Sequence, residues 1–99
     1  MDSPISPHWN VELHCHTWWS KDSLASPRSL LAACRRKGID RLAVTDHNTL
    51  RGALESAALA PDLFIVGEEI LTTEGELLGY FMIEEIPAGL SPQATIDRL

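Results

Sequence analysis

Apolar residues along this chain fall into two alternating patterns, short continuous runs and longer segments with helical spacing. Residues 11–16, 41–45 and 63–66 predict strands, because each run is short, contains Val or Leu and is bounded by polar or turn residues. Residues 26–38 and 49–60 predict helices, since the first starts with a Ser-Pro pair and ends at a glycine, and the second is followed by a proline. This order predicts an α/β fold in which parallel strands alternate with helices.

The pattern changes after the third predicted strand. Gly67 should end that strand, and residues 70–73 and 76–83 then predict two strands joined by a turn at Glu74-Gly75. Ser91-Pro92 repeats the helix-start signal, but only a short helix can follow it. A short helix is not a typical end for an α/β domain, so we expect the chain to be truncated and the C-terminal part of its domain to be missing.

The length and the net charge of the chain limit the size of its domain and the partners that it can bind. The 99 residues suffice for one small domain or a part of one, with a thin core. A formal net charge of −6 and a pI near 5.0 argue against a broad basic surface that would bind nucleic acid. The basic residues 35–37 fall where the first helix should end, and there they complement the helix dipole.

The cysteines and the hydrophobic runs indicate a cytoplasmic protein. Cys15 and Cys34 have neither a Cys-x-x-Cys spacing nor the pattern of a disulfide framework, which is typical of a reducing compartment. The first ten residues lack the apolar run of a signal peptide, and no later run is long enough to span a bilayer. We therefore expect no membrane partner.

Groups that bind metal ions follow three of the predicted strands. They are His14 and His16, Asp46 and His47, and Glu68 and Glu69. The carboxyl ends of parallel strands meet at one edge of a sheet, so these side chains should gather there. Residues two apart in a strand point to the same face at roughly 7 Å spacing, so His14 and His16 can converge on one cation while Cys15 faces away. A single His-x-His pair can also be two polar groups in a strand, but three such strand ends favour a metal site.

The mixture of nitrogen and oxygen donors defines the metals that such a site would select. It suits zinc, manganese or iron and disfavours calcium or a thiolate-bound structural zinc. Such a site hydrolyses phosphate esters by lowering the pKa of bound water. Cys15 and Cys34 are expected to pack as small hydrophobic residues. Trp18 and Trp19 either line a substrate pocket or cover the end of a barrel.

The combined motifs resemble those of the polymerase and histidinol phosphatase (PHP) superfamily. The matching segments are His14-Cys15-His16-Thr17 with Ser20-Lys21-Asp22-Ser23, Thr45-Asp46-His47-Asn48-Thr49, and Gly67-Glu68-Glu69. The resemblance covers residues 11–86. It implies that residues 1–99 are the N-terminal portion of a distorted (β/α)7 barrel with up to three divalent metal ions at the carboxyl ends of its strands.

The resemblance also assigns roles to individual residues. It implies that His14 and His16 hold the first metal, that Asp22 and His47 hold another, and that Glu69 bridges. Glu69 lies two residues after the glycine, as in the family pattern.

Three further acidic residues have less direct roles. Asp46 should orient its surroundings by hydrogen bonding, and with Glu69 it forms the candidate catalytic pair. Glu68 would be a neighbour of the metals. Glu76 stands where many relatives have a histidine, and it is either a metal ligand or a solvated glutamate on a hairpin.

The implied activity is metal-dependent phosphoester hydrolysis. Relatives act as histidinol phosphatases, as 5′ to 3′ exonuclease-like phosphoesterases of nucleotides or oligonucleotides, and as proofreading or accessory domains of bacterial DNA polymerases. The late His-Pro and Asp-x-His motifs of the family do not occur in this sequence. A non-catalytic metal-binding module, an inactive fragment, and a chain completed by a partner therefore remain as alternatives.

Overall fold

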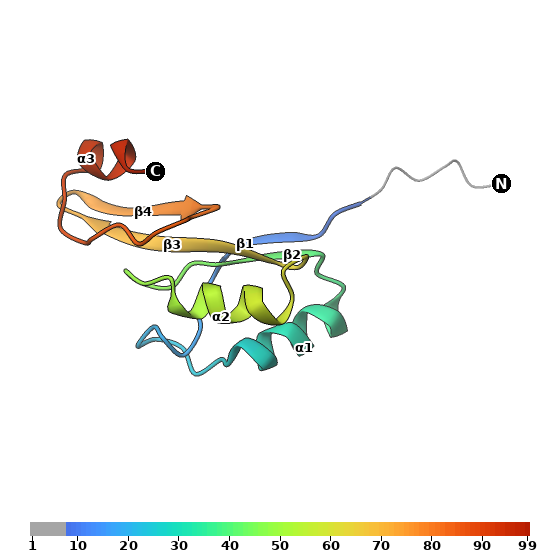
Figure 1. Ribbon diagram of the computed structural model, residues 1–99. Coiled ribbons are helices and arrows are strands. Elements are labelled where there is room, and N and C mark those ends of the chain that lie inside the picture. The colour runs from blue at the N-terminus through green and yellow to red at the C-terminus, as the bar shows by residue number, and fades with distance from the viewer. Residues whose placement is uncertain (1–7) are drawn as a thin grey trace.

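The computed structural model describes residues 8–99 and confirms the predicted α/β order (Figure 1). The elements are β1 (Val11–Cys15), α1 (Pro27–Lys37), β2 (Arg41–Val44), α2 (Arg51–Leu59), β3 (Phe64–Thr72), β4 (Gly75–Tyr80) and α3 (Pro92–Asp97). In Figure 1, α1 and α2 lie together on one face of the sheet, and α3 lies beyond the hairpin of β3 and β4. Within residues 8–99, every helix is too short or too polar to cross a lipid bilayer.

The four strands form one mixed, mostly parallel sheet in the order β1-β2-β3-β4. β1 pairs with β2, and β2 with β3, in parallel, whereas β4 returns antiparallel to β3. The hydroxyl of Tyr80 at the end of β4 donates a hydrogen bond of 2.8 Å to the carbonyl oxygen of Leu13 in β1, which shows that the sheet is curled. The first and last strands of the order therefore approach each other across one face, and the sheet is a half-barrel.

The prediction that Gly67 ends the third strand is wrong. β3 continues through Gly67 and changes partner there, with Phe64 to Val66 paired to β2 and Gly67 to Thr72 paired to β4. A Cβ atom on Gly67 would lie 2.8 Å from the carbonyl oxygen of Gly79 and 2.8 Å from the methyl group of Thr45. The glycine is thus required for close approach of neighbouring strands. β4 ends at Tyr80, three residues before the predicted end, since Phe81 adopts a positive φ of 55°.

The apolar core lies between the sheet and the two helices. Its buried members are Cys34, Leu42, Val44, Ala53 and Phe64. α1 begins as predicted, because the side chain of Ser26 caps it by accepting a hydrogen bond from the amide of Ser29. Since side chains alternate along a strand, burying one face of β2 and β3 under the helices leaves the other face for polar groups.

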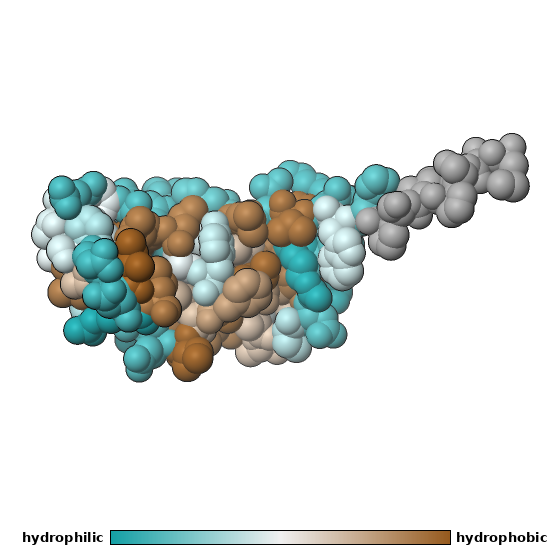
Figure 2. Space-filling view, turned by 90° about the horizontal axis from the view of Figure 1, so that it is seen from above, coloured by the Kyte–Doolittle hydropathy of each residue, from teal (hydrophilic) through white to brown (hydrophobic). Residues whose placement is uncertain are grey.

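Figure 2 shows the side of the molecule that α1 and α2 leave uncovered, where hydrophilic and hydrophobic side chains are mixed. Two large apolar side chains after β4 are almost fully exposed, Phe81 at 78% and Ile83 at 95%. The segment after β4 is nonetheless anchored, because Glu85 accepts hydrogen bonds from the hydroxyl of Thr49 and the amide of Leu50 at the start of α2.

Candidate metal centre

The carboxyl end of β1 brings two imidazole rings together. The Nε2 atoms of His14 and His16 lie 3.2 Å apart. Both face Oε1 of Glu69, at 2.5 Å from His14 and 3.1 Å from His16. The ladder between β1 and β2 shifts register between Glu12 and Cys15. Irregularities of this kind redirect side chains beside active sites, and here the two histidines converge on one carboxylate.

Glu69 also contacts a third imidazole. Its second oxygen, Oε2, lies 3.4 Å from Nδ1 of His47. His47 follows β2 and forms an isolated parallel bridge with Glu69, so the chain after β2 runs beside β3 for one further pair. Only 10% of the Glu69 side chain is exposed. Its two oxygens are therefore directed at imidazole nitrogens on both sides.

Asn48 fixes His47 beside Glu69. Its φ of 54° is in the left-handed region, which asparagine tolerates better than most residues. In this conformation its amide donates to the carbonyl oxygen of Glu69 at 2.9 Å, while its side-chain oxygen accepts from the amide of Leu71 at 2.9 Å. No role of Asn48 was predicted from the sequence, although an asparagine shortly after a strand end is typical of such turns.

Two more carboxylates approach from the loop after β1 and from β4. Asp22 lies 3.0 Å from Nδ1 of His16 and 3.2 Å from Nε2 of His47. Burial acts to raise the pKa of Asp22, but hydrogen bonds from both imidazoles outweigh it and hold that pKa below its usual value. Glu76 is paired with Leu71 across the hairpin, and its Oε2 lies 3.4 Å from Nδ1 of His47. Glu76 thus lies beside the cluster, although 44% of its side chain remains exposed.

The six predicted ligands form three overlapping groups, in each of which the donor atoms lie within 4.8 Å of one another. The groups are His14, His16 and Glu69; His16, Asp22 and His47; and His47, Glu69 and Glu76. A neutral imidazole has one unprotonated nitrogen, so a histidine shared by two groups can serve only one of them at a time. The first and third groups share only Glu69, through different oxygens, and can be filled together. Asp22 can then accept the remaining N–H of His16 and of His47.

Asp46 organises the loop after β1 from a fully buried position. Its Oδ1 accepts from the amide of Thr17 at 2.6 Å and the hydroxyl of Ser20 at 2.8 Å, and its Oδ2 accepts from the Thr17 hydroxyl at 2.5 Å. The amide of His47 in turn donates to the Ser20 hydroxyl at 3.0 Å. A Cβ atom on Gly52 of α2 would collide with Thr17 and Asp46. Sequence reasoning assigned no role to Thr17, Ser20 or Gly52, although a glycine inside a helical pattern can indicate such close packing.

Glu68 points to the opposite face of β3 from Glu69. It is fully buried, and its Oε1 accepts a hydrogen bond of 3.0 Å from the amide of Ile86, while its Oε2 has no hydrogen-bond partner among residues 8–99. Burial raises the pKa of this carboxyl, and the nearby charge of Glu85 raises it further. Glu68 is a neighbour of the cluster in sequence, but it belongs to none of the three groups.

The cysteines lie on the helix side of the sheet. Cys34 is a buried member of the core, and Cys15 is half-buried and packs against it. Burial raises the pKa of both thiols, which disfavours the thiolate form that binds metals. Cys15 thus faces away from the cluster, as the spacing predicted.

Trp18 and Trp19 lie beside α2. Trp19 donates its indole N–H to Glu55 at 3.1 Å, and the guanidinium of Arg51 lies 5.0 Å from its ring centroid. Trp18 lines a pocket of about 350 Å³ together with Pro27 and Glu55. None of the predicted ligands lines this pocket, so the pocket that Trp18 lines does not include the cluster.

Open space adjoins the cluster itself. A pocket of about 440 Å³ is lined by His14, Cys15, His16, Asp22, Ser23, Ala25 and Leu30. Its volume is within the range of small-molecule sites. The imidazoles therefore border a space that a small ligand can enter.

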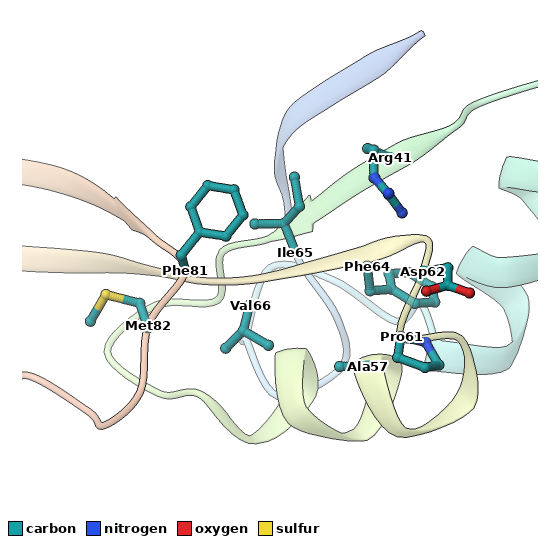
Figure 3. Close-up of a pocket in the computed structure, with 9 residues that line it drawn as sticks. All are labelled: Arg41, Ala57, Pro61, Asp62, Phe64, Ile65, Val66, Phe81 and Met82. Carbon is teal, nitrogen blue, oxygen red and sulfur yellow. The ribbon is translucent and has the colours of Figure 1, made fainter. Parts of the chain in front are cut away.

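A third pocket, of about 430 Å³, lies along the first half of β3 (Figure 3). Its lining combines Arg41 and Asp62 with apolar side chains. Figure 3 shows Ile65 and Phe81 on one side of β3 and Val66 on the other. The lining of this pocket includes no predicted ligand, so the cluster around Glu69 remains the candidate site.

Comparisons with known proteins identify the family. Residues 12–75 match the PHP domain family. Two uncharacterized proteins of Methanocaldococcus jannaschii are similar over 90% of the chain, one at 42% identity and the other at 41%. The chain spans only 60% and 34% of the lengths of these two relatives.

One solved structure is similar in fold. It is the crystal structure of a "putative metal-dependent phosphoesterase" from Bifidobacterium adolescentis, with a TM-score of 0.57 and 28% identity. The similarity covers 73% of this chain and 27% of that protein. Most of the half-barrel therefore resembles one part of the Bifidobacterium adolescentis protein, which is a longer chain.

Proposed function

The chain belongs to the PHP domain family, and from this premise we propose that the cluster around Glu69 is a metal centre for phosphoester hydrolysis. The observation that carries the proposal is the position of Glu69, with Oε1 facing His14 and His16 and Oε2 facing His47. A carboxylate placed in this way can bridge two cations, as in two-metal hydrolases. The similar protein from Bifidobacterium adolescentis supports this, since it is described as metal-dependent.

The donor set fits divalent transition metals. Three imidazoles and three carboxylates offer the mixed nitrogen and oxygen ligands that zinc, manganese and iron accept, and the thiols lie on the other face of the sheet. We propose that His14, His16 and Glu69 hold one ion and that His47, Glu69 and Glu76 hold a second. In the alternative arrangement, Asp22 and His47 bind one ion together, as members of the group that also contains His16.

Each residue then has a defined task. Bound ions would supply water with a lowered pKa and would neutralise charge on the phosphoryl oxygens. Glu69 keeps the two groups of ligands together, and Asp22 holds the tautomers of His16 and His47. Asp46 contributes indirectly, because it orders the loop that carries Asp22 and has both oxygens engaged in hydrogen bonds.

The proposed substrates are small phosphoesters, nucleotides or the ends of oligonucleotides. The net charge of −6 favours a small or terminal substrate over long nucleic acid held by a basic surface. We place the protein in the cytoplasm, where its two free thiols would stay reduced. Because the chain spans 27% of the similar solved protein, further chain or a partner would complete the pocket that selects the substrate.

Two other functions follow from the same cluster. One is a metal-binding module without catalysis, or an inactive fragment, which the three ligand groups alone would satisfy. The other is an accessory or proofreading domain of a bacterial DNA polymerase. The second would require a larger protein that contains this chain.

Hydrolysis of bis-p-nitrophenyl phosphate and p-nitrophenyl phosphate with added Mn²⁺ tests the proposal. We expect metal-dependent release of p-nitrophenol that Glu69→Gln abolishes and Glu68→Gln retains, because of these two neighbours it is Glu69 that faces the imidazoles. Bound metal without turnover would favour the non-catalytic module. Turnover that persists in Glu69→Gln would rule out this centre as its source.

A further inference from the structure

Tyr80 connects the last strand of the half-barrel to the first. Its hydroxyl donates a 2.8 Å hydrogen bond to the carbonyl oxygen of Leu13, a residue 67 positions earlier in the sequence. Leu13 directly precedes His14. The contact therefore meets β1 at the peptide that leads into the candidate metal centre.

The register of the hairpin places Tyr80 on the same face as the cluster. Directly opposed residues of antiparallel strands share a face, and so do residues two apart along a strand. Tyr80 is opposite Gly67, and Glu76 is opposite Leu71. Glu69, Glu76 and Tyr80 thus project from one side of the sheet, and Gly67 adds no side chain beneath the Tyr80 ring.

The part of β1 that Tyr80 contacts is weakly supported otherwise. β1 lies at the edge of the sheet, so within residues 8–99 it has a strand partner on one side only. Its ladder with β2 shifts register between Glu12 and Cys15, the interval that contains Leu13 and His14. A hydrogen bond at this irregularity restrains a backbone that the ladder holds less firmly.

We propose that Tyr80 is a positioning residue of the metal centre, whose hydroxyl holds the Leu13 carbonyl so that His14 stays directed at Glu69. The inference rests on the proposed metal centre. It adds a group outside the ligand set, on β4, which lies three places from β1 in the sheet. Its effect on metal binding should pass through His14.

Isothermal titration of the chain with Co²⁺, followed by visible absorption of the bound ion, tests the proposal. Tyr80→Phe removes the hydroxyl and keeps the ring, and we expect about tenfold weaker binding of the first Co²⁺, with an altered visible band. Thr72→Val is the matched control. It also removes a hydroxyl that donates a hydrogen bond, of 2.7 Å, to a backbone carbonyl oxygen, that of Gly75 in the same hairpin. It should bind Co²⁺ like the unsubstituted chain.

A double-mutant cycle separates positioning from general destabilisation. If Tyr80 acts through His14, Tyr80→Phe should cause no further loss of Co²⁺ affinity in a His14→Ala background. Unchanged affinity and spectrum in Tyr80→Phe, or an equal loss in both backgrounds, would overturn the proposal. Absence of Co²⁺ binding by the unsubstituted chain would overturn the metal centre as well, so the two failures can be distinguished.

Discussion

Glu68 and Glu69 are neighbours on β3, and their surroundings differ completely. Glu69 faces the open side of the curled sheet, where its oxygens approach three imidazoles. Glu68 faces the opposite side, where it is fully buried and one of its oxygens lacks a hydrogen-bond partner within the part of the chain that the structure describes. The alternation of side chains along a strand separates the two carboxylates onto different faces.

The two glutamates show that the faces of the sheet have different roles, since one face packs against the core and the other carries the candidate ligands. On the helix side, the strands contribute apolar residues to the core, and a carboxylate there lowers stability unless it is protonated. On the other side, carboxylates and imidazoles from three strands and two loops collect at the carboxyl ends of the parallel strands. Polar groups on that side can bind cations without disturbing the core.

The largest difference should separate the two glutamates in metal binding. We expect Glu69→Gln to weaken binding by more than about 100-fold, the upper end for residues that merely orient ligands, because it removes the bridging charge. Glu68→Gln should leave the affinity unchanged. Titration of each variant with Mn²⁺ or Zn²⁺ measures this, and the reverse ranking would show that the assignment of faces is wrong.

The same contrast applies to β1. His14→Ala and His16→Ala should each reduce metal affinity by at least about 10-fold, whereas Cys15→Ala should retain it because Cys15 packs against the core. Metal content after dialysis gives the comparison. Equal losses in all three variants would contradict the separation of the strand's two faces.

Asp22 is either a metal ligand or a group that orients His16 and His47, and substitution can distinguish these roles. If Asp22 orients His16 and His47, Asp22→Asn should cost about tenfold in metal affinity, since the amide oxygen can still accept one N–H. A loss as large as that of Glu69→Gln would instead identify Asp22 as a ligand. Parallel titrations of the two variants decide between these roles.

The smallest effect concerns stability on the buried side. Burial raises the folded-state pKa of Glu68 above its usual 4.5, so the chain loses stability as the pH rises through that raised pKa. Glu68→Gln cannot ionise and should be more stable at pH 7 by about 1 kcal/mol, the lower end of the cost of an unpaired buried polar group. The advantage should vanish below pH 4.5. Urea unfolding at several pH values measures it, and a constant difference across pH would exclude ionisation as the cause.

Much of the fold and of the candidate site followed from the sequence. Capping signals such as Ser26 and the apolar runs predicted the order of strands and helices, because both are local. Four of the six proposed ligands, His14, His16, His47 and Glu69, were named from their positions at strand ends, whereas Asp22 and Glu76 were named only from the family resemblance. The prediction that Gly67 stops a strand was wrong, because the role of this glycine depends on contacts with Gly79 and Thr45, which are distant in the sequence.

The supporting residues could not be predicted for the same reason. Thr17 contacts Asp46 across 29 positions, and Tyr80 contacts Leu13 across 67. Local patterns carry no information about such pairs. They form only when the curled sheet brings separate strands together.

The central claim is that this cluster binds divalent metal through Glu69. Metal content per chain, measured by inductively coupled plasma mass spectrometry of protein purified without chelator, tests it most directly. We predict up to two equivalents of manganese, iron or zinc in the unsubstituted chain, matching the two groups that share only Glu69, and a near-complete loss in Glu69→Gln. No bound metal in the unsubstituted chain, or equal content in Glu69→Gln, would contradict the account.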